Sequence, residues 1–316
     1  MKPEISISTP SVAIILVNWN GYEFTSACIN SLLKIRYPNY KIILVDNGSQ
    51  DKSGTRLKKE FDDITLISLK ENLGFCGGNN AGIRYAVQNN YDYCLLLNND
   101  TETEAQFLEH LVEGLNKNPK CAAIQPKIYY MHNKQLLWNA GGLYNSHLGI
   151  PSTIGLNKKN KPLYDESRFT DWITGCCILI KTSVIKEIGL LDEQFFAYFE
   201  DVDWSLRMRK AGYKLLYEPR SVIYHVAGAS SKSSEKNKEG KLNPIIHYYN
   251  VRNHLYLIRK HSKGLNRISS FTFQFLKIIA YSLYFIIRLR FKKLKFALKG
   301  FKDGFKMEIQ TQQEII

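Results

Sequence analysis

Short apolar runs alternate with amphipathic segments through the first hundred residues of the chain. Four runs rich in aliphatic and β-branched residues predict strands at residues 12–17, 41–45, 64–69 and 93–97. Between them, apolar positions spaced three or four apart predict helices at residues 22–34, near 52–61 and at 81–88. Strands that alternate with helices in this way predict an α/β fold, with a mostly parallel sheet flanked by helices.

Polar residues occupy the positions at which three of these strands end. Asn18 and Asn20 follow the first strand, Asp46 follows the second, and the run from Asn98 to Asp100 follows the fourth. In an open parallel sheet, ligands bind beyond the carboxyl ends of the strands. A single polar strand end is common, but three at one edge predict a binding site there.

The run of Asn98, Asn99 and Asp100 has the chemistry of a cation site. Amide and carboxylate oxygens two positions apart at a strand end can point the same way and hold Mg²⁺ or Mn²⁺, which would bridge the oxygens of a diphosphate. His225 follows an apolar run at residues 222–224, and its neutral imidazole would complete the site with Asp100. Asn and Asp also favour turns, and most single His residues after a strand are inert, so a plain turn stays open as an alternative.

A glycine-rich segment at residues 71–80 is predicted to be a loop that leads into the third helix. It contains Asn72, Gly74, Gly78 and Asn79. Glycine lets the backbone approach a ligand closely, and the amino end of a helix favours phosphate. The spacing is not GxGxxG, so the segment is not the dinucleotide-binding fingerprint. A tight turn and a ligand-binding loop are both compatible with it.

Four aromatic residues at 195–199 come directly before three carboxylates at 200–203, at the start of a helix predicted for residues 201–210. Acids at this end of a helix are stabilised by its dipole, which is a structural role. An apolar wall would also raise the pKa of a carboxylate and keep it basic enough to accept a proton. Asp201 and Asp203 diverge by about 200° around a helix, so they cannot share one task. We therefore expect one carboxylate to be a base and another to be a structural or acceptor-binding group.

The remaining segments complete the expected organisation. Residues 141–161, rich in glycine and lysine, predict a mobile loop, and residues 173–180 predict a return to β structure. Residues 230–241 are mostly Ser, Lys and Glu and are expected to be flexible. The expected division is a tail at residues 1–11, an α/β domain at 12–240 and a helical, amphipathic segment at 241–316.

Positive charge is concentrated in the carboxyl-terminal segment. The 316-residue chain has a formal net charge of +14, yet its first 240 residues hold 28 basic and 26 acidic residues. Residues 241–302 hold 14 Lys or Arg and no Asp or Glu. The apolar run at 271–287 is 17 residues long, which is the lower limit for a spanning helix. Basic flanks on both sides favour a helix that lies in the interface of an anionic membrane.

This positive charge is compatible with other partners and arrangements. A pair of core helices with a solvated basic face is the alternative to a membrane surface. Nucleic acid is not expected as a partner, because no recognition fold is visible. The first eleven residues are not typical of a signal peptide, and the six cysteines have no CxxC spacing. Reduced thiols in the cytoplasm are therefore expected.

The polar segments occur in an order, and at spacings, that resemble glycosyltransferase family 2. These segments are VNWN at 17–20, VDNGS at 45–49, NLGFCGGNN at 72–80, NND at 98–100, TG at 174–175 and ED at 200–201. The resemblance covers residues 12–230, about two thirds of the chain, and is strongest to rhamnosyltransferase-type members. It implies a GT-A fold, which is a Rossmann-like, mostly parallel sheet flanked by helices.

The resemblance also implies a role for each matching residue. Asp201 would be the catalytic base, and Asp46 would read a pyrimidine base. The metal group would be Asn98, Asp100 and His225, although Asn98 replaces the first acid of the family's DxD motif, which puts its direct ligation in doubt. The other donor-binding residues would be Asn18, Asn20, Asn72, Gly74, Gly78, Asn79 and Asn99. The acceptor-binding residues would be Trp172, Thr174, Gly175 and Glu200.

These roles describe a metal-dependent, inverting glycosyltransferase at the inner face of the cell membrane. It would move a sugar (rhamnose, by resemblance alone) from a dTDP- or UDP-sugar to a hydroxyl of a glycan or lipid-linked acceptor in cell-surface polysaccharide synthesis. A sugar-nucleotide nucleotidyltransferase is the main alternative, but residues 17–21 lack the Arg or Lys that such enzymes carry in their first loop. A non-catalytic sugar-nucleotide-binding protein is a second alternative. Assembly into a homodimer is left open.

Overall fold

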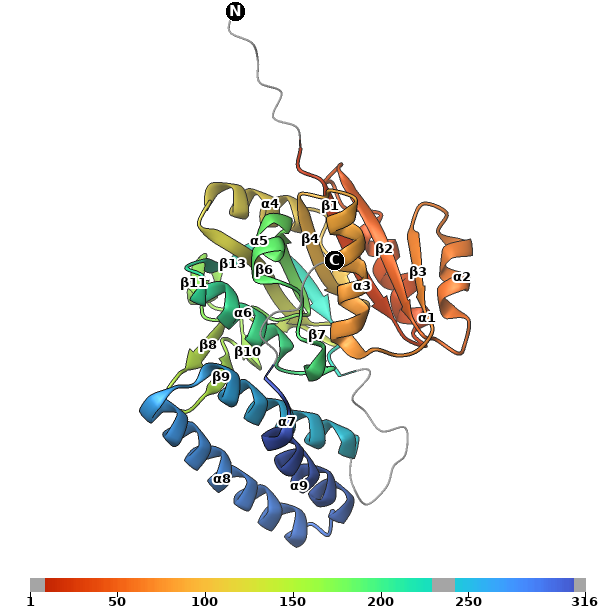
Figure 1. The fold of residues 1–316 in the computed structure, drawn as a ribbon. Coiled ribbons are helices and arrows are strands. Elements are labelled where there is room, and N and C mark those ends of the chain that lie inside the picture. The colour runs from red at the N-terminus through yellow and green to blue at the C-terminus, as the bar shows by residue number, and fades with distance from the viewer. Residues whose placement is uncertain (1–8, 229–241, 310–316) are drawn as a thin grey trace, which may run out of the picture.

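The computed structural model describes residues 9–228 and 242–309, which are built around one twisted sheet (Figure 1). The first strand, β1 (Val12–Asn18), pairs in parallel with β2 (Tyr40–Asn47) on one side and with β4 (Tyr93–Asn98) on the other. β3 (Thr65–Leu69) continues the parallel part beyond β2. The four predicted strands are all present, and the predicted α/β fold with a mostly parallel central sheet is confirmed.

Apolar side chains of β1 alternate between the two faces of the sheet. Ile14 and Leu16 belong to one core and Ile15 to the other, and all three are fully buried. The first core is covered by α1 (Tyr22–Leu32), α2 (Ser53–Glu60) and α4 (Phe107–Lys117). The second is covered by α3 (Gly74–Gln88), α5 (Thr182–Ile188) and α6 (Glu200–Lys210). Neither face meets water, which explains why the strands are continuous apolar runs in the sequence.

The second half of the sheet departs from the parallel pattern. β12 (Cys177–Lys181) runs antiparallel between β4 and β6 (Cys121–Tyr130), and β6 is followed by β7 (Asn133–Asn139) and β10 (Lys158–Lys159). The long β13 (Lys214–His225) pairs with β6, β5 (Thr101–Thr103) and β11 (Arg168–Thr170). In this register His225 lies opposite Thr101, so the end of β13 reaches the end of β4.

Two segments that were predicted to be loops are regular structure. The glycine-rich segment is mostly helix, because α3 already begins at Gly74. Residues 141–161 were predicted to be a mobile loop, but they contain the hairpin of β8 (Gly142–Asn145) and β9 (Ile150–Thr153), followed by β10. The hairpin covers the indole of Trp172, which donates to the Leu143 carbonyl at 3.1 Å, a contact with no local signature in the sequence. The predicted flexible segment at residues 230–241 lies outside the described residues.

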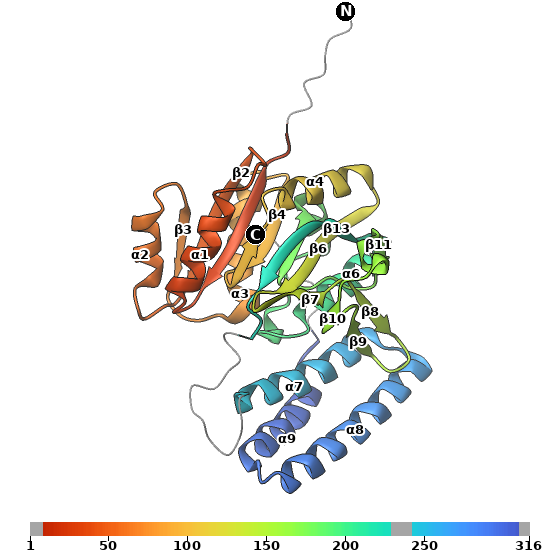
Figure 2. The ribbon, with the colours of Figure 1, turned by 180° about the vertical axis from the view of Figure 1, so that it is seen from behind.

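Three helices lie beyond the carboxyl ends of the parallel strands: α7 (Pro244–His261), α8 (Gly264–Ile287) and α9 (Phe291–Lys306). Figure 2 shows the same layer from behind, with α8 at its outer edge. α7 also joins the core of the preceding part, because Tyr256 and Leu257 are buried among residues of α3 and α6. α9 is held to α7 by contacts such as that of Arg259, which donates to the Gly304 carbonyl at 2.9 Å. The domain boundary expected near residue 240 stays a prediction.

Candidate active site

A buried asparagine ties together the carboxyl ends of β1 and β2. Asn18 is fully buried, and its amide nitrogen donates to Asp46 Oδ1 at 3.2 Å and to Ser53 Oγ at 2.7 Å. Its amide oxygen accepts a hydrogen bond from the Thr25 hydroxyl at 2.9 Å. Both ends of the amide are used within the protein, so Asn18 shapes this edge rather than presenting a free group to a ligand.

Asp46 and Asn20 border the same edge. Asp46 retains an exposed fraction of 9%, at the point where β2 ends. Asn20 is exposed and has a φ of 50°, and its amide oxygen accepts a hydrogen bond from the Gln50 N–H at 2.8 Å. This bond fixes the turn after β2 against the turn after β1, so the two predicted donor-binding residues lie on neighbouring, connected turns.

The predicted donor-binding residues of the glycine-rich segment are mostly packed against their neighbours. Gly74 has a φ of 72°, and a methyl group there would stand 2.5 Å from the Phe196 carbonyl oxygen. A methyl group at Gly78 would stand 2.7 Å from a methyl carbon of Val17, so α3 lies directly on β1. Asn79 is also buried and donates to a carbonyl of its own helix. Asn72 differs from these, because it remains partly accessible where the helix begins.

β4 and β13 bring the predicted metal group together. His225 Nε2 lies 3.1 Å from Asp100 Oδ1, and the Asn98 amide nitrogen lies 3.5 Å from the same ring nitrogen. The side chains of Asp100 and His225 are 11% and 6% exposed, so water screens their interaction only weakly. Asn99 points elsewhere and donates to the Thr25 hydroxyl of α1 at 2.7 Å. Asn98, Asp100 and His225 therefore form one cluster, and Asn99 stands apart from it.

This cluster fits a divalent cation whose coordination is completed by a substrate. The described residues contain no group of three His, Cys, Asp or Glu side chains around one metal position. Asp100 and His225 supply two donors, and Asn98 can add an amide oxygen. Mg²⁺ is commonly held by one or two carboxylates together with substrate phosphates, so a diphosphate would supply the missing oxygens. His225 Nδ1 is buried without a hydrogen-bond partner among the described residues. The tautomer of this ring therefore depends on the group that binds Nε2.

Two adjacent carboxylates at the start of α6 have raised pKa values. Burial raises the pKa of Asp201, although the Gly175 N–H, which donates to Asp201 Oδ2 at 2.9 Å, opposes the shift. Burial raises the pKa of Glu200 well above its usual value, and the charge of Asp201 adds to the effect. Glu200 Oε2 is buried and has no hydrogen-bond partner among the described residues. We therefore expect a neutral Glu200 beside an ionised Asp201, which makes Asp201 the available proton acceptor.

Asp203 has the opposite electrostatic surroundings. It is fully buried, and its carboxylate meets three basic side chains, Arg207 at 2.9 Å, Lys260 at 2.9 Å and His261 at 2.7 Å. Burial alone would raise the pKa of Asp203, but these neighbours lower it well below its usual value. A carboxylate held ionised by these basic neighbours is a poor proton acceptor, which favours a structural role for Asp203.

Two consecutive residues connect the carboxylate pair to the metal group. The Gly175 N–H donates to Asp201, and the carbonyl of the next residue, Cys176, accepts a hydrogen bond from the Asn98 N–H at 2.8 Å. This bridge is possible because β12 runs antiparallel beside β4 and begins where β4 ends. The two candidate reactive groups therefore face the same end of the sheet.

Of the four predicted acceptor-binding residues, two lie at the carboxylate pair and two are packed beneath it. Trp172 is only 8% exposed beneath the β8–β9 hairpin, and the Thr174 N–H donates to the buried Gln125 side chain at 3.2 Å. Glu200 is one of the two carboxylates, and Gly175 donates its N–H to the other, Asp201. Trp172 and Thr174 thus support the floor of the site, and Gly175 and Glu200 border the base.

Residues of α7 reach this site although the sequence had not singled them out. Arg252 and Asn253 bond to carbonyls of the loop that precedes Glu200, and Lys260 and His261 reach Asp203. Asn253 interrupts an apolar helical pattern, which is the signal of a buried polar partner. That pattern does not say which segment supplies the partner, because the two are more than fifty positions apart.

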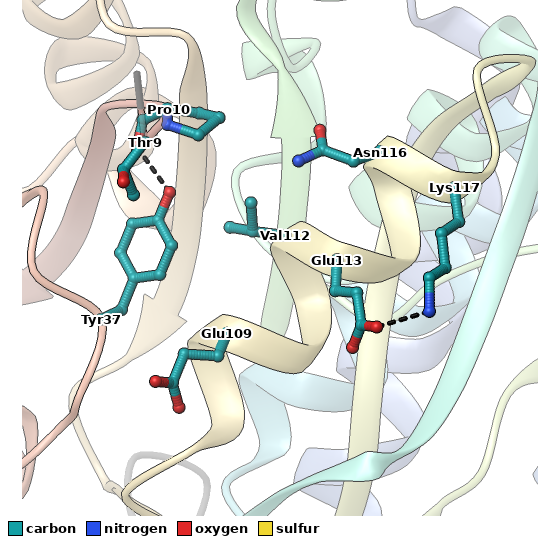
Figure 3. Close-up of a pocket in the computed structure, with 8 residues that line it drawn as sticks. All are labelled: Thr9, Pro10, Tyr37, Glu109, Val112, Glu113, Asn116 and Lys117. Atoms are coloured by element: carbon teal, nitrogen blue, oxygen red, sulfur yellow. Dashed lines mark hydrogen bonds and ion pairs between the residues drawn. The ribbon is translucent and has the colours of Figure 1, made fainter. Parts of the chain in front are cut away.

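A separate recess of about 500 Å³ lies at the other end of the sheet (Figure 3). It is formed by the residues before β1, by Tyr37 and by one side of α4, including Glu109 and Asn116. The Tyr37 hydroxyl donates to the Pro10 carbonyl at 2.6 Å and closes one wall. The recess lies at the amino end of β1, so it does not belong to the candidate active site.

Comparison with known sequences identifies relatives of the α/β part. The family model described as Glycosyl transferase family 2 matches residues 13–189. Poly-β-1,6-N-acetyl-D-glucosamine synthase of Staphylococcus aureus is 25% identical over 226 residues, which cover 71% of this chain and 52% of that protein. The chain therefore spans about half the length of the curated relatives that it matches.

Solved structures share the fold over nearly the whole chain. GalNAc-T7 with UDP, GalNAc and Mn²⁺ has a TM-score of 0.61 at 15% identity, covering 95% of this chain and 56% of that one. Residues 1–349 of TarS from Staphylococcus aureus have a TM-score of 0.57 at 15% identity, covering 93% and 80%. The mannosyltransferase PcManGT from Pyrobaculum calidifontis, in complex with GDP-Man and Mn²⁺, has a TM-score of 0.56 at 11% identity, covering 96% and 77%. At these identities the likeness is one of fold, and it confirms the predicted GT-A arrangement.

Proposed function

This chain belongs to glycosyltransferase family 2, and we propose that it transfers a sugar from a nucleoside diphosphate sugar to a hydroxyl group, with inversion at the anomeric carbon. The observation that carries the proposal is the bridge at residues 175 and 176, which connects Asp201 to the metal group. A direct displacement needs both groups. A base must take the proton of the attacking hydroxyl, and positive charge must stabilise the leaving diphosphate.

Each reactive residue has a defined task in this displacement. Asp201 accepts the proton of the acceptor hydroxyl as its oxygen attacks the anomeric carbon from the face opposite the nucleotide. Glu200 stays protonated, which leaves a single negative charge beside the attacking oxygen. Asp100 and His225, with Asn98, would hold Mg²⁺ or Mn²⁺. The cation, when bound, offsets the charge that develops on the diphosphate. One displacement inverts the configuration without a covalent glycosyl intermediate.

The proposed donor is a dTDP- or UDP-sugar, with rhamnose as the candidate sugar from the sequence resemblance. Asp46, at the end of β2, would accept the ring N–H of uracil or thymine, the role that the sequence resemblance implies. The ligands named with two structural neighbours are UDP with Mn²⁺ and GDP-Man with Mn²⁺, which supports a nucleoside diphosphate sugar and a divalent cation. The name of the Staphylococcus aureus relative supports a role in polysaccharide synthesis, with a glycan or lipid-linked hydroxyl as the proposed acceptor.

A panel of donors tests the proposed function. The full chain is incubated with UDP-, dTDP- and GDP-sugars, Mn²⁺ or Mg²⁺, and a lipid-linked glycan fraction. We expect metal-dependent release of a nucleoside diphosphate from one class of donor, together with label in the glycan fraction. Formation of a sugar nucleotide and pyrophosphate from a sugar phosphate and a nucleoside triphosphate would instead identify a nucleotidyltransferase. Tight donor binding without turnover would identify a binding protein.

The exposed surface of α8 supports a position on the inner face of the membrane. Within the described residues, α8 is the helix long and apolar enough to cross a membrane by length and composition. Its outer side exposes large apolar residues, including Leu276, Leu283 and Ile287, while Ser270 and Gln274 are buried. The inner side of α8 also buries Ile278 and Phe285, so apolar residues occupy both sides of this helix, and the exposed ones are suited to contact with lipid.

Contacts on the inner side of α8 favour a helix that lies in the membrane surface. The Gln274 amide lies 3.2 Å from the His254 ring of α7, and Ser270 Oγ donates to the His147 carbonyl at 3.2 Å. A helix fastened to the protein along one side cannot be surrounded by lipid. Exposed lysines of α9, including Lys295 and Lys299, would add attraction to anionic headgroups. We therefore place the protein in the cytoplasm, peripherally bound to the inner leaflet.

Charged substitutions on the outer face of α8 test this position. The double substitution Leu276→Asp with Leu283→Asp is expected to lower partitioning onto phosphatidylglycerol vesicles by at least about ten-fold, because one buried leucine contributes about 1.5–3 kcal/mol. Flotation of the full chain with the vesicles is the measurement. Leu163→Asp, at a leucine equally exposed in the α/β part, is the matched control and should float as the unchanged protein does. Equal flotation of the double variant would remove α8 as the membrane contact.

A further inference from the structure

The loop that leads into the carboxylate pair is held in an unfavourable backbone conformation. Phe196, Tyr198 and Phe199 have φ values of 63°, 74° and 72°. Bulky residues other than glycine rarely adopt positive φ, and such conformations persist where the surrounding structure holds them. The last of the three, Phe199, is the residue before α6, and its carbonyl accepts the Asp203 N–H at 2.9 Å. The conformation of this loop therefore sets where α6, with Glu200 and Asp201, begins.

One buried side chain of α7 holds the loop carbonyls. Asn253 is fully buried, and its amide nitrogen lies 2.9 Å from the Phe195 carbonyl, 2.8 Å from that of Ala197 and 2.8 Å from that of Tyr198. An amide nitrogen has two hydrogens, so three carbonyls that converge on it share its donors. They point to a single centre only while the loop keeps its positive φ values. Asn253 and the strained loop are therefore one structural unit.

The neighbour of Asn253 fixes the orientation of its amide. Arg252 Nε donates to Asn253 Oδ1 at 2.8 Å, which directs the amide nitrogen toward the loop. A second guanidinium nitrogen of Arg252 donates to the Gln194 carbonyl at 2.7 Å and to the Phe195 carbonyl at 2.9 Å. The guanidinium cannot lose its proton, so this arrangement admits one orientation of the amide.

Aromatic contacts of the same helix close the loop from the outside. The Phe196 ring stacks on Tyr249 at 5.2 Å between centroids, and the Phe199 ring stacks on His254 at 4.8 Å. Tyr198, which lies between them, remains 37% exposed. The loop thus turns two rings toward α7 and leaves one aromatic side chain accessible, two residues before Glu200.

From this arrangement we propose that Asn253 is a positioning residue for the acceptor half of the reaction. It holds residues 195–199 in the one conformation that places Asp201 against the Gly175 N–H and presents Tyr198 to the acceptor. Asn253 itself touches neither substrate. The inference rests on the proposed glycosyl transfer, and it assigns α7 to the catalytic machinery in addition to any membrane contact.

The donor side of the site has little dependence on this unit. Asp46, Asp100 and His225 belong to β2, to the end of β4 and to β13, and none of them bonds to the loop or to Asn253 among the interactions of the described residues. Among the described residues, the loop meets the donor side at the start of α3, where the Cys76 N–H donates to the Phe196 carbonyl at 3.2 Å and Gly74 packs against the same carbonyl. Loss of the unit should therefore affect transfer much more than nucleotide binding.

Two substitutions with a matched control test the proposal. Asn253→Leu keeps the volume and removes every donor, and Asn253→Ser keeps one donor in a smaller side chain. Asn250→Leu is the control, because Asn250 lies one turn away on α7 and its amide donates only within that helix, to the Ile246 carbonyl at 3.0 Å. The measurements are kcat for transfer, Kd for the nucleoside diphosphate and Mn²⁺, Tm, and hydrogen exchange of the amides of residues 195–203.

We expect Asn253→Leu to lower kcat by about 10²-fold, the scale of a catalytic group displaced by roughly 1 Å. The Kd for the nucleotide should change less than about two-fold, and exchange at residues 195–203 should rise. Asn253→Ser should lie between this variant and the unchanged protein, and Asn250→Leu should keep its kcat and its exchange pattern. If Asn253→Leu does not fold, the same measurements of kcat, Kd and hydrogen exchange on Asn253→Ser test the proposal.

Two results would overturn the proposal. One is a folded Asn253 variant with a lower Tm but an unchanged kcat and unchanged exchange in the loop. The other is an equal loss of transfer and of nucleotide binding, which would show a general defect. Absence of turnover by the unchanged protein with every donor would count against the proposed function instead, and the exchange measurement would still report whether Asn253 holds the loop.

Discussion

Asp201→Asn is expected to lower kcat for sugar transfer by about 10²–10⁴-fold, the usual contribution of a general base. Asn keeps the size of the side chain and can still accept the hydrogen bond from the Gly175 N–H, but it cannot take a proton. Donor affinity should change little, because the base acts on the acceptor hydroxyl. Initial rates with the donor found by the panel, at saturating Mn²⁺, and the nucleotide Kd of both proteins are the measurements.

Asp203→Asn is the matched control on the same helix, and it should fail in a different way. Removing the buried charge leaves Arg207, Lys260 and His261 without their shared partner. Breaking a buried ion pair typically costs about 3–5 kcal/mol, so the free energy of unfolding should fall by that order. The folded fraction should retain kcat within a few-fold of normal. The opposite result would assign the base to Asp203: Asp201→Asn would keep near-normal turnover, and folded Asp203→Asn would lose it.

Asp100→Ala is expected to abolish donor binding that depends on Mg²⁺ or Mn²⁺ and to lower transfer by at least about 10²-fold. The reason is that Asp100 supplies the carboxylate of the metal group, while His225 and Asn98 contribute no negative charge to a cation. Calorimetric titration with the nucleoside diphosphate, with Mn²⁺ and again with excess EDTA, measures the metal-dependent part of the affinity. The fold should survive, because the Asp100 side chain forms its contact at the edge of the sheet and not in its core.

A carboxylate two positions further along provides the control for this experiment. Glu102 lies on β5 with nearly half of its side chain exposed, and its only ion pair among the described residues is a distant one to Lys134 at 3.8 Å. Glu102→Ala should therefore leave metal-dependent binding unchanged. The unchanged protein is also assayed in excess EDTA. If transfer continues at the full rate there, a metal at Asp100 is excluded.

The parallel part of the sheet could be predicted from the sequence because its signals are local. Each strand is a run of apolar residues, and each polar strand end follows its run directly, as Asp46 follows residues 41–45. The glycine-rich segment was less predictable. Its glycines suggested a loop, yet α3 begins at Gly74, because tight packing of Gly78 on Val17 outweighs the weak helix propensity of glycine.

The metal group combines two neighbouring residues with one that no local pattern connects to them. Asn98 and Asp100 are neighbours in the sequence, but His225 is far along the chain, and no spacing rule connects it to them. The structure brings the three together because β13 runs antiparallel to β5, opposite the end of β4. Whether they hold a cation is still a prediction, and Asp100→Ala is its test.

The sequence by itself determined the alternation of strands and helices, the polar edge of the sheet and the two carboxylates at the start of α6. The tertiary structure added the electrostatic surroundings that favour Asp201 over Asp203 as the base, an assignment that stays a prediction. Asp203 meets basic side chains from α6 and α7, while Asp201 accepts a backbone N–H and adjoins Glu200, whose pKa burial raises. It also decided that α7, whose basic charge suggested only a membrane surface, holds the loop before Glu200 through Asn253. The physical reason is the same in both cases. The pKa of a carboxylate and the conformation of a strained loop depend on groups more than fifty positions away, and periodicity along the chain contains no information about such contacts.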